Sequence, residues 1–218
     1  MAVAAGRHRL GPDRGRLLLR TSRHGLAAQA GHDLTIEVAR WSGELTVGGD
    51  RRPAELAVVI DLGSLVVVAG TGGIKPLTER DRREIVTTAA KVLQADRYPQ
   101  ARFVATGFEP DPSQTRATLW RGAVTGTLTI RDRSRPLRLE VVGAGDVAGA
   151  GDVAGAGDVD GAGEAGGRRY RATATVVQSD YGIKPYTAFL GALRVRDAVD
   201  VDVELDLSEP ETPLPKQP

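Results

Sequence analysis

Residues 199–207 read Val-Asp-Val-Asp-Val-Glu-Leu-Asp-Leu, with an apolar residue at every odd position and an acidic residue at every even one. Successive side chains of a β-strand point to opposite faces, so this pattern is typical of a strand with one face in a core and the other in water. Similar segments recur between turn-forming residues. We expect further strands at 16–21, 33–40, 43–47, 54–61, 101–108, 115–120, 123–130, 137–142 and 170–178.

One helix interrupts these strands. Thr78 is a good N-cap residue, and Asp81, three positions later, predicts a capping box. Apolar residues follow at helical spacing until Pro99, which prevents the helix from continuing into the next strand. Many antiparallel strands with a single mid-chain helix predict an all-β sandwich or closed barrel, and a barrel has the advantage that no strand edge is left unpaired.

Length and composition narrow the classes of protein that need to be considered. The 218 residues suit one domain, and 29 Lys and Arg against 28 Asp and Glu do not give the basic surface of a nucleic-acid-binding protein. The absence of cysteine excludes disulfides and thiolate metal sites. The longest leucine run, 17–19, is too short for a signal peptide, and no apolar stretch is long enough to span a bilayer, so we expect a cytoplasmic protein.

Composition also sets the expected domain boundaries. We expect a disordered Arg-rich arm at 1–14, a single barrel domain at 15–208 and a disordered Pro-rich tail at 209–218. The repeated GAGDVA of residues 143–167 predicts a flexible low-complexity insert, because Gly and Ala bury little apolar surface. Its regularly spaced aspartates leave a calcium-binding repeat as the alternative. The arm could instead contact anionic lipid or RNA.

Three short motifs occur in a characteristic order around these elements: RYPQARF at 97–103, GTLTI at 126–130 and SDYGI at 179–183. In this order and spacing the chain resembles the YceI-like family over roughly residues 16–207, apart from the insert. The resemblance implies an extended lipocalin-like barrel that holds a polyisoprenoid or another lipid chain, with no catalytic activity and no cofactor.

A barrel of about eight strands can enclose one small or elongated ligand, so its interior is the candidate site. Alternation along the strands predicts an apolar, inward-facing set: Ile36, Val38, Leu45, Val58, Ile60, Phe103, Leu128, Ile130, Val201 and Val203. The alternative is that these side chains fill a solid core in a ligand-free structural or interaction domain.

The tetrapeptide Gly-Ile-Lys-Pro occurs twice, at 73–76 and 182–185. If both loops meet at one end of the barrel, Lys75 and Lys184 could hold the phosphate of an isoprenyl phosphate or the carboxylate of a fatty acid. Tyr181 and Phe189, beside the second copy, would cover the mouth of the barrel or plug it. Chance repetition of a turn sequence is the alternative reading.

The sequence offers little for catalysis or metal binding. His24, His32 and Asp33 form the one conceivable cluster, and neither an HExxH motif nor a nucleophile elbow is present. We therefore expect a lipid-binding protein that is not an enzyme and holds no metal. An enzyme using His32 and Asp33 is the alternative, and it requires both side chains to line the cavity. The sequence does not determine the oligomeric state, and a homodimer is one alternative.

Overall fold

The computed structural model describes residues 3–50, 52–111, 119–144 and 169–208. Its longer elements are β1 (Gly6–Leu10), β2 (Gly15–Thr21), β4 (Asp33–Val38), β5 (Trp41–Val47), β6 (Pro53–Asp61), β7 (Leu65–Thr71), α1 (Glu79–Leu93), β8 (Gln100–Pro110), β9 (Leu119–Ile130), β10 (Arg133–Ala144), β11 (Arg169–Val177) and β14 (Ala198–Asp206). The short elements are β3 (Arg23–His24), η1 (Ala28–Ala30), η2 (Gln178–Tyr181), β12 (Thr187–Ala188), η3 (Phe189–Gly191) and β13 (Leu193–Val195).

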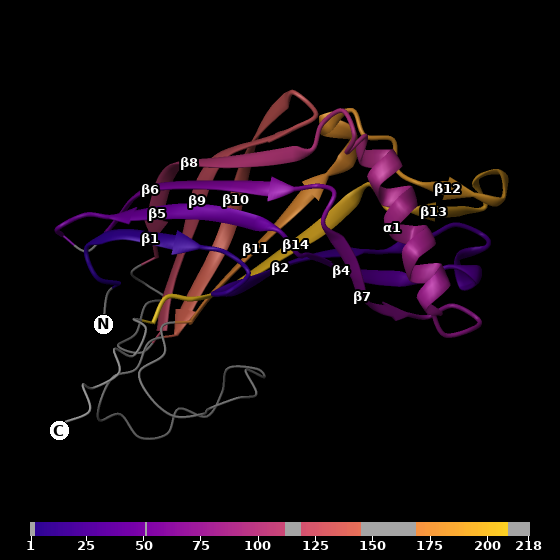
Figure 1. The fold of residues 1–218 in the computed structure, drawn as a ribbon, viewed down its shortest axis with the longest axis horizontal. Coiled ribbons are helices and arrows are strands. Elements are labelled where there is room, and N and C mark those ends of the chain that lie inside the picture. The colour runs from indigo at the N-terminus through magenta and orange to yellow at the C-terminus, as the bar shows by residue number, and fades with distance from the viewer. Residues whose placement is uncertain (1–2, 51, 112–118, 145–168, 209–218) are drawn as a thin grey trace, which may run out of the picture.

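Eleven strands form one antiparallel sheet in the order β1-β5-β6-β8-β9-β10-β11-β14-β2-β4-β7. The sheet curls strongly around its inner face, and α1 lies at one end of it beside a small sheet of β12, β13 and β3 (Figure 1). This arrangement confirms the predicted class, mostly antiparallel β with one helix in a lipocalin-like architecture. The register sets inward-facing residues side by side: Val58 is paired with Phe103, and Phe103 with Leu128.

The sheet does not close into a barrel by strand pairing, contrary to the expectation that no strand edge would be left unpaired. The sheet ends in β1 and β7, and the described residues show no pairing between these two strands. At the β7 edge, the Arg82 guanidinium of α1 donates a hydrogen bond to the Val67 carbonyl oxygen over 2.7 Å. The helix therefore satisfies one main-chain group of this edge and lies beside β7, which helps to protect the edge.

Strand β1 corrects the expectation of a disordered arm at 1–14. Residues 6–10 pair with β5, Leu10 is buried, and the Arg7 guanidinium lies 3.7 Å from the Glu44 carboxylate. The sequence signal is weak because an edge strand is held mainly by main-chain hydrogen bonds and needs little apolar alternation. Strand β7, another edge strand, is likewise missing from the expected set.

The predicted insert begins two residues too early. Gly143 and Ala144 belong to β10, where they pair with Tyr170 and Arg169. The rest of the insert with its aspartates, the tail at 209–218 and most of the strand expected at 115–120 lie outside the described residues.

The capping box of α1 is confirmed. The Asp81 amide donates to the Thr78 hydroxyl over 3.2 Å, and the Thr78 amide donates to the Asp81 carboxylate over 2.8 Å. The apolar face of the helix, including Ile85, Ala89 and Leu93, packs against the core of the curled sheet. No helix in the described part of the chain is long and apolar enough to cross a membrane.

Removing the cap is expected to destabilise the protein modestly. Replacing Thr78→Ala removes an acceptor for the first turn of α1 and should lower the free energy of unfolding by about 1 kcal/mol. Thr87→Ala is the matched control, because Thr87 is exposed on the same helix and its hydroxyl donates only to the Arg83 carbonyl oxygen. Thermal unfolding followed by circular dichroism measures both variants, and equal effects would contradict the assigned cap.

Candidate functional site

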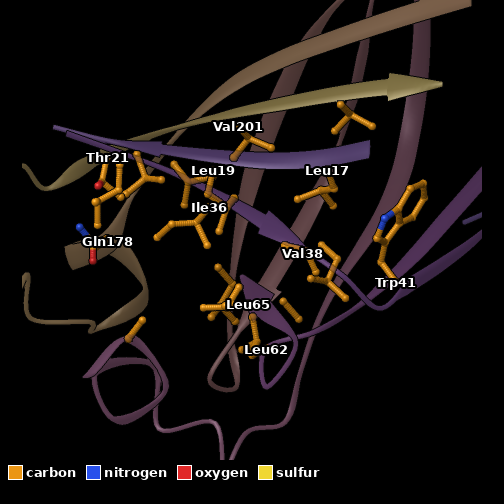
Figure 2. A pocket seen from close by; sticks show the side chains of 18 of the residues that line it. Leu17, Leu19, Thr21, Ile36, Val38, Trp41, Leu62, Leu65, Gln178 and Val201 are labelled. Carbon is orange, nitrogen blue, oxygen red and sulfur yellow. The ribbon is translucent and has the colours of Figure 1, made fainter. Parts of the chain in front are cut away.

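The curled sheet encloses a cavity of about 1410 Å³. Figure 2 shows side chains of β2, β4 and β14, among them Leu19, Ile36 and Val201, pointing into this space. Helix α1 contributes Ile85, Ala89 and Leu93 to its wall. Sites for small ligands usually measure roughly 300–1,000 Å³, so this cavity is large enough for a ligand bigger than a typical metabolite.

All ten apolar residues predicted to face inward line this cavity: Ile36, Val38, Leu45, Val58, Ile60, Phe103, Leu128, Ile130, Val201 and Val203. Their placement follows from the alternation of side chains along each strand. Because a large cavity remains among these side chains, the interior is hollow, which disfavours the alternative of a filled barrel.

The cavity extends along the molecule. Its lining includes Val3 and Pro53, near the β5–β6 hairpin, as well as Lys75 and Phe189 at the other end. Figure 1 shows the β5–β6 hairpin and the β12–β13 sheet at opposite ends of the long axis. This shape fits an elongated ligand better than a compact one.

Three segments, 22–32, 72–77 and 182–195, come together at the end beside α1, and we call them the mouth loops. The Ala27 amide donates to the Ala192 carbonyl oxygen over 2.9 Å, which joins the first segment to the third. His32 Nε2 lies 2.8 Å from the Lys75 carbonyl oxygen, which joins the first to the second. Several residues of these loops are exposed and also line the cavity, so the cavity reaches the surface here.

The two Gly-Ile-Lys-Pro copies lie in opposite environments. In the first copy, Ile74 and Lys75 are both exposed and both line the cavity. In the second, Ile183 is buried and lines the cavity, whereas Lys184 is exposed and does not line it. The structure therefore does not place the two lysines together around the cavity, as a shared head-group site would require.

The two aromatic residues predicted at the mouth, Tyr181 and Phe189, lie in different environments. Phe189 lines the cavity at the mouth. Tyr181 does not line it, and its side chain is buried in the core cluster that also contains Phe103 and Leu128. Burial raises the pKa of the Tyr181 hydroxyl, with a smaller contribution from the charge of Asp180. Tyr181 is thus a core residue that supports the loop beside the mouth.

The pair needed for acid–base chemistry is not assembled in the cavity. His32 lines the cavity, but Asp33 does not. The Asp33 carboxylate accepts a hydrogen bond from the Arg23 amide over 2.7 Å and forms an ion pair with the Arg23 guanidinium at 3.2 Å. These contacts hold the start of β4 in place. The described residues contain no group of three or more His, Cys, Asp or Glu arranged to hold a metal ion.

Trp41 is a cavity residue that the expected strands omit. Its side chain lines the cavity (Figure 2). Its buried Nε1 has no hydrogen-bond partner among the described residues. Strand β5 begins at Trp41, two residues before the expected start at Gly43. The signal was present, since Trp41 continues the alternation of Leu45 and Val47, but the small Gly43 interrupts it.

Comparison with solved structures supports the fold. The crystal structure of BcnA from Burkholderia cenocepacia is 15% identical, with a TM-score of 0.54, and the match covers 88% of this chain and 95% of that one. A mutant YceI protein of Campylobacter jejuni with a monobromobimane guest is 17% identical, with a TM-score of 0.52, over 81% and 85% of the two chains.

A search of curated proteins found no match. The model of the YceI-like domain, in contrast, matches residues 19–207. That range includes most of the curled sheet, all of α1 and the three mouth loops, and it holds nearly every residue that lines the cavity. The chain therefore belongs to the YceI-like family.

Proposed function

We propose that this protein binds an elongated apolar ligand, a polyisoprenoid or a fatty-acyl lipid, inside the cavity without transforming it. The observation that supports this most strongly is the continuous apolar wall around about 1410 Å³. Burying an alkyl chain stabilises the complex by about 0.8 kcal/mol per CH₂, so ten methylenes supply about 8 kcal/mol. Before the cost of ordering the ligand, that corresponds to a dissociation constant of roughly 1 µM.

The chemistry of the wall favours an aliphatic ligand. Val, Leu and Ile supply most of the lining, and the six aromatic residues in it are spread over β5, β8, β11 and the third mouth loop: Trp41, Phe103, Phe108, Tyr170, Tyr186 and Phe189. Flat bases and sugars are usually recognised by stacking on several aromatic rings. A wall made mostly of Val, Leu and Ile, with its aromatic rings dispersed, offers instead an apolar surface that a flexible hydrocarbon chain can follow.

Polar groups gather at the mouth, where a head group would lie. Lys75, Arg23 and Arg194 line this end of the cavity together with the carboxylates of Asp81 and Glu84. Asp81 is engaged in the cap of α1, and Glu84 forms an ion pair with Arg80 at 3.2 Å. Arg23 is held by Asp33, and the Arg194 guanidinium donates to the Gly191 carbonyl oxygen. No ion pair or side-chain hydrogen bond of the Lys75 ammonium occurs among the described residues. Lys75 is therefore the cation best placed to meet an anionic head group.

Native mass spectrometry tests the proposal. The protein would be purified without detergent, and any bound species would be extracted with organic solvent and identified. We expect a stoichiometric mass increment that extracts as a polyprenyl or acyl chain. A bare polypeptide mass that persists after incubation with isoprenoid and fatty-acid mixtures would instead support a ligand-free interaction domain.

Lys75→Ala is expected to weaken binding of a fatty acid about threefold, because a partly solvated ion pair contributes on the order of 0.5–1 kcal/mol. Binding of the corresponding fatty alcohol should not change. Lys184→Ala is the matched control, since Lys184 is exposed and does not line the cavity. Titration with each ligand measures the effect, and equal losses for acid and alcohol would remove the head-group role of Lys75.

A further inference from the structure

Large apolar side chains are concentrated on the outside of the mouth loops. Leu26 and Leu190 are fully exposed, and Ile74 and Phe189 are 78% and 64% exposed. Single exposed apolar residues are common on soluble proteins, but a group at the opening of a cavity marks a surface that meets an apolar partner.

The backbone of the third mouth loop fixes two of these residues in an unusual conformation. Phe189 and Leu190 have φ values of 50° and 53°, in the left-handed region that bulky residues avoid. The turn is fixed by a hydrogen bond from the Arg194 guanidinium to the Gly191 carbonyl oxygen, 2.8 Å long. A strained turn that is braced in this way keeps its two apolar side chains in place when no partner is present.

The loop that carries Leu26 is attached directly to this turn. Gly25, with φ 105°, lies so close to the Ala192 carbonyl oxygen that an added Cβ would approach to 2.3 Å. The adjacent hydrogen bond between the Ala27 amide and the Ala192 carbonyl oxygen ties the two loops together. Leu26 and Leu190 therefore belong to one surface, although 164 positions separate them in the sequence.

This surface is continuous with the cavity, and the mouth loops themselves carry cations and no acidic residue, although Asp81 and Glu84 of α1 line the same opening. Ile74 and Phe189 are both exposed and part of the cavity lining, so an apolar chain leaving the cavity meets them directly. Lys75 and Arg194 line the same opening, and the exposed Lys184 lies in the third mouth loop. Exposed apolar side chains with neighbouring cations are the features by which proteins bind the interface of an anionic bilayer.

We propose that the mouth loops dock on an anionic lipid bilayer, with Leu26 and Leu190 inserted into the interface, so that an apolar chain passes between the bilayer and the cavity. This inference rests on the proposed lipid-binding function. It identifies the membrane surface, rather than the aqueous phase, as the source or destination of the ligand.

Vesicle flotation with the full chain tests the inference. The probes are vesicles of phosphatidylcholine alone and of phosphatidylcholine mixed with phosphatidylglycerol. The test variant carries Leu26→Ser and Leu190→Asn. Neither leucine lines the cavity, and asparagine tolerates the left-handed backbone better than leucine does. The matched control carries Val66→Ser and Val104→Ser, which removes two exposed apolar side chains from β7 and β8.

We expect the wild-type chain and the control to float with the mixed vesicles and to prefer them over phosphatidylcholine alone. The test variant should bind them on the order of tenfold more weakly for each leucine replaced. Its binding of a fatty acid delivered from ethanol should stay unchanged. Failure of the wild-type chain to float, or equal flotation of the test variant, would overturn the inference.

Two further results separate this inference from the proposed function. Flotation that depends on Leu26 and Leu190, in a protein that binds no acyl chain, would support docking and contradict lipid binding in the cavity. The wild-type chain could also self-associate in sedimentation without floating on vesicles. If the two substitutions abolish that self-association, the partner is a second copy of the chain, and membrane docking is overturned.

Discussion

Enlarging two side chains inside the cavity, Val58→Phe together with Val201→Phe, is expected to weaken binding of a long acyl chain by roughly 50-fold. Both valines line the cavity from β6 and β14 and keep part of their surface exposed to it. Two phenyl groups that displace about three ligand methylenes remove about 2.4 kcal/mol of apolar burial. Titration with a fluorescent fatty acid measures the loss.

The matched control makes the same chemical change on the outer face of the sheet. Val66→Phe together with Val104→Phe adds two phenyl groups to exposed positions on β7 and β8. We expect its affinity to stay within twofold of the wild-type value. If the cavity variant binds as tightly as this control while remaining folded, the ligand does not occupy the cavity.

The second large effect concerns stability: Asp202→Asn is expected to lower the free energy of unfolding at pH 7 by about 2 kcal/mol. Asp202 is 3% exposed on the outer face of β14 and accepts hydrogen bonds from Arg171 Nε at 2.8 Å and from Arg20 at 3.2 Å. These contacts link β11, β14 and β2, three neighbouring strands of the cavity wall. For a chain of this length the melting temperature should fall by roughly 4–8 °C.

The effect should also depend on pH. Burial alone would raise the pKa of Asp202, but the hydrogen bonds from Arg171 and Arg20 outweigh burial and hold the pKa below its ordinary value. The ionised carboxylate therefore stabilises the fold above the unfolded pKa of about 3.9, and this contribution is lost as the pH falls through the folded pKa. The Asn variant should approach wild-type stability in that acidic range.

Asp200→Asn is the control for this network. Asp200 is exposed, lies on the same face of β14 and accepts one hydrogen bond, from the Thr175 hydroxyl at 2.8 Å. We expect a loss within about 0.5 kcal/mol. Urea unfolding at pH 7 and at acidic pH compares the two variants, and a difference that does not shrink on acidification would contradict the role of the Asp202 charge.

Local sequence signals were sufficient for most of the fold. Strict alternation identified β14, and Thr78 with Asp81 identified the start of α1, because both signals depend on neighbours in sequence. Strand β1 was not predicted because its pairing with β5 leaves little apolar pattern, whereas β7 was not predicted although its run Leu-Val-Val-Val at 65–68 is typical of a strand. The sequence also could not predict that β1 and β7 stay unpaired with each other, because that depends on how far the sheet curls and on where α1 packs.

In the candidate site, too, the part that depends on local sequence was predictable and the part that depends on contacts between distant segments was not. The ten residues that alternation predicted to face inward do line the cavity, since a strand with one face inward determines which side chains face the interior. The mouth was not predictable in this way. The two Gly-Ile-Lys-Pro copies look equivalent, yet the first places both its isoleucine and its lysine at the cavity and the second only its isoleucine, because different partners fix the two loops. The coupling of Leu26 to Leu190 depends on the contact between Gly25 and Ala192.

Quenching of Trp41 fluorescence tests the central claim, that an apolar chain occupies the cavity, most directly. Trp41 lines the cavity, and Trp120→Phe would leave it as the single tryptophan. Titration with a fatty acid brominated along its chain should quench Trp41 emission saturably at one ligand per protein, and an unbrominated chain should compete. Absence of quenching, or quenching that rises without saturation, would contradict binding inside the cavity.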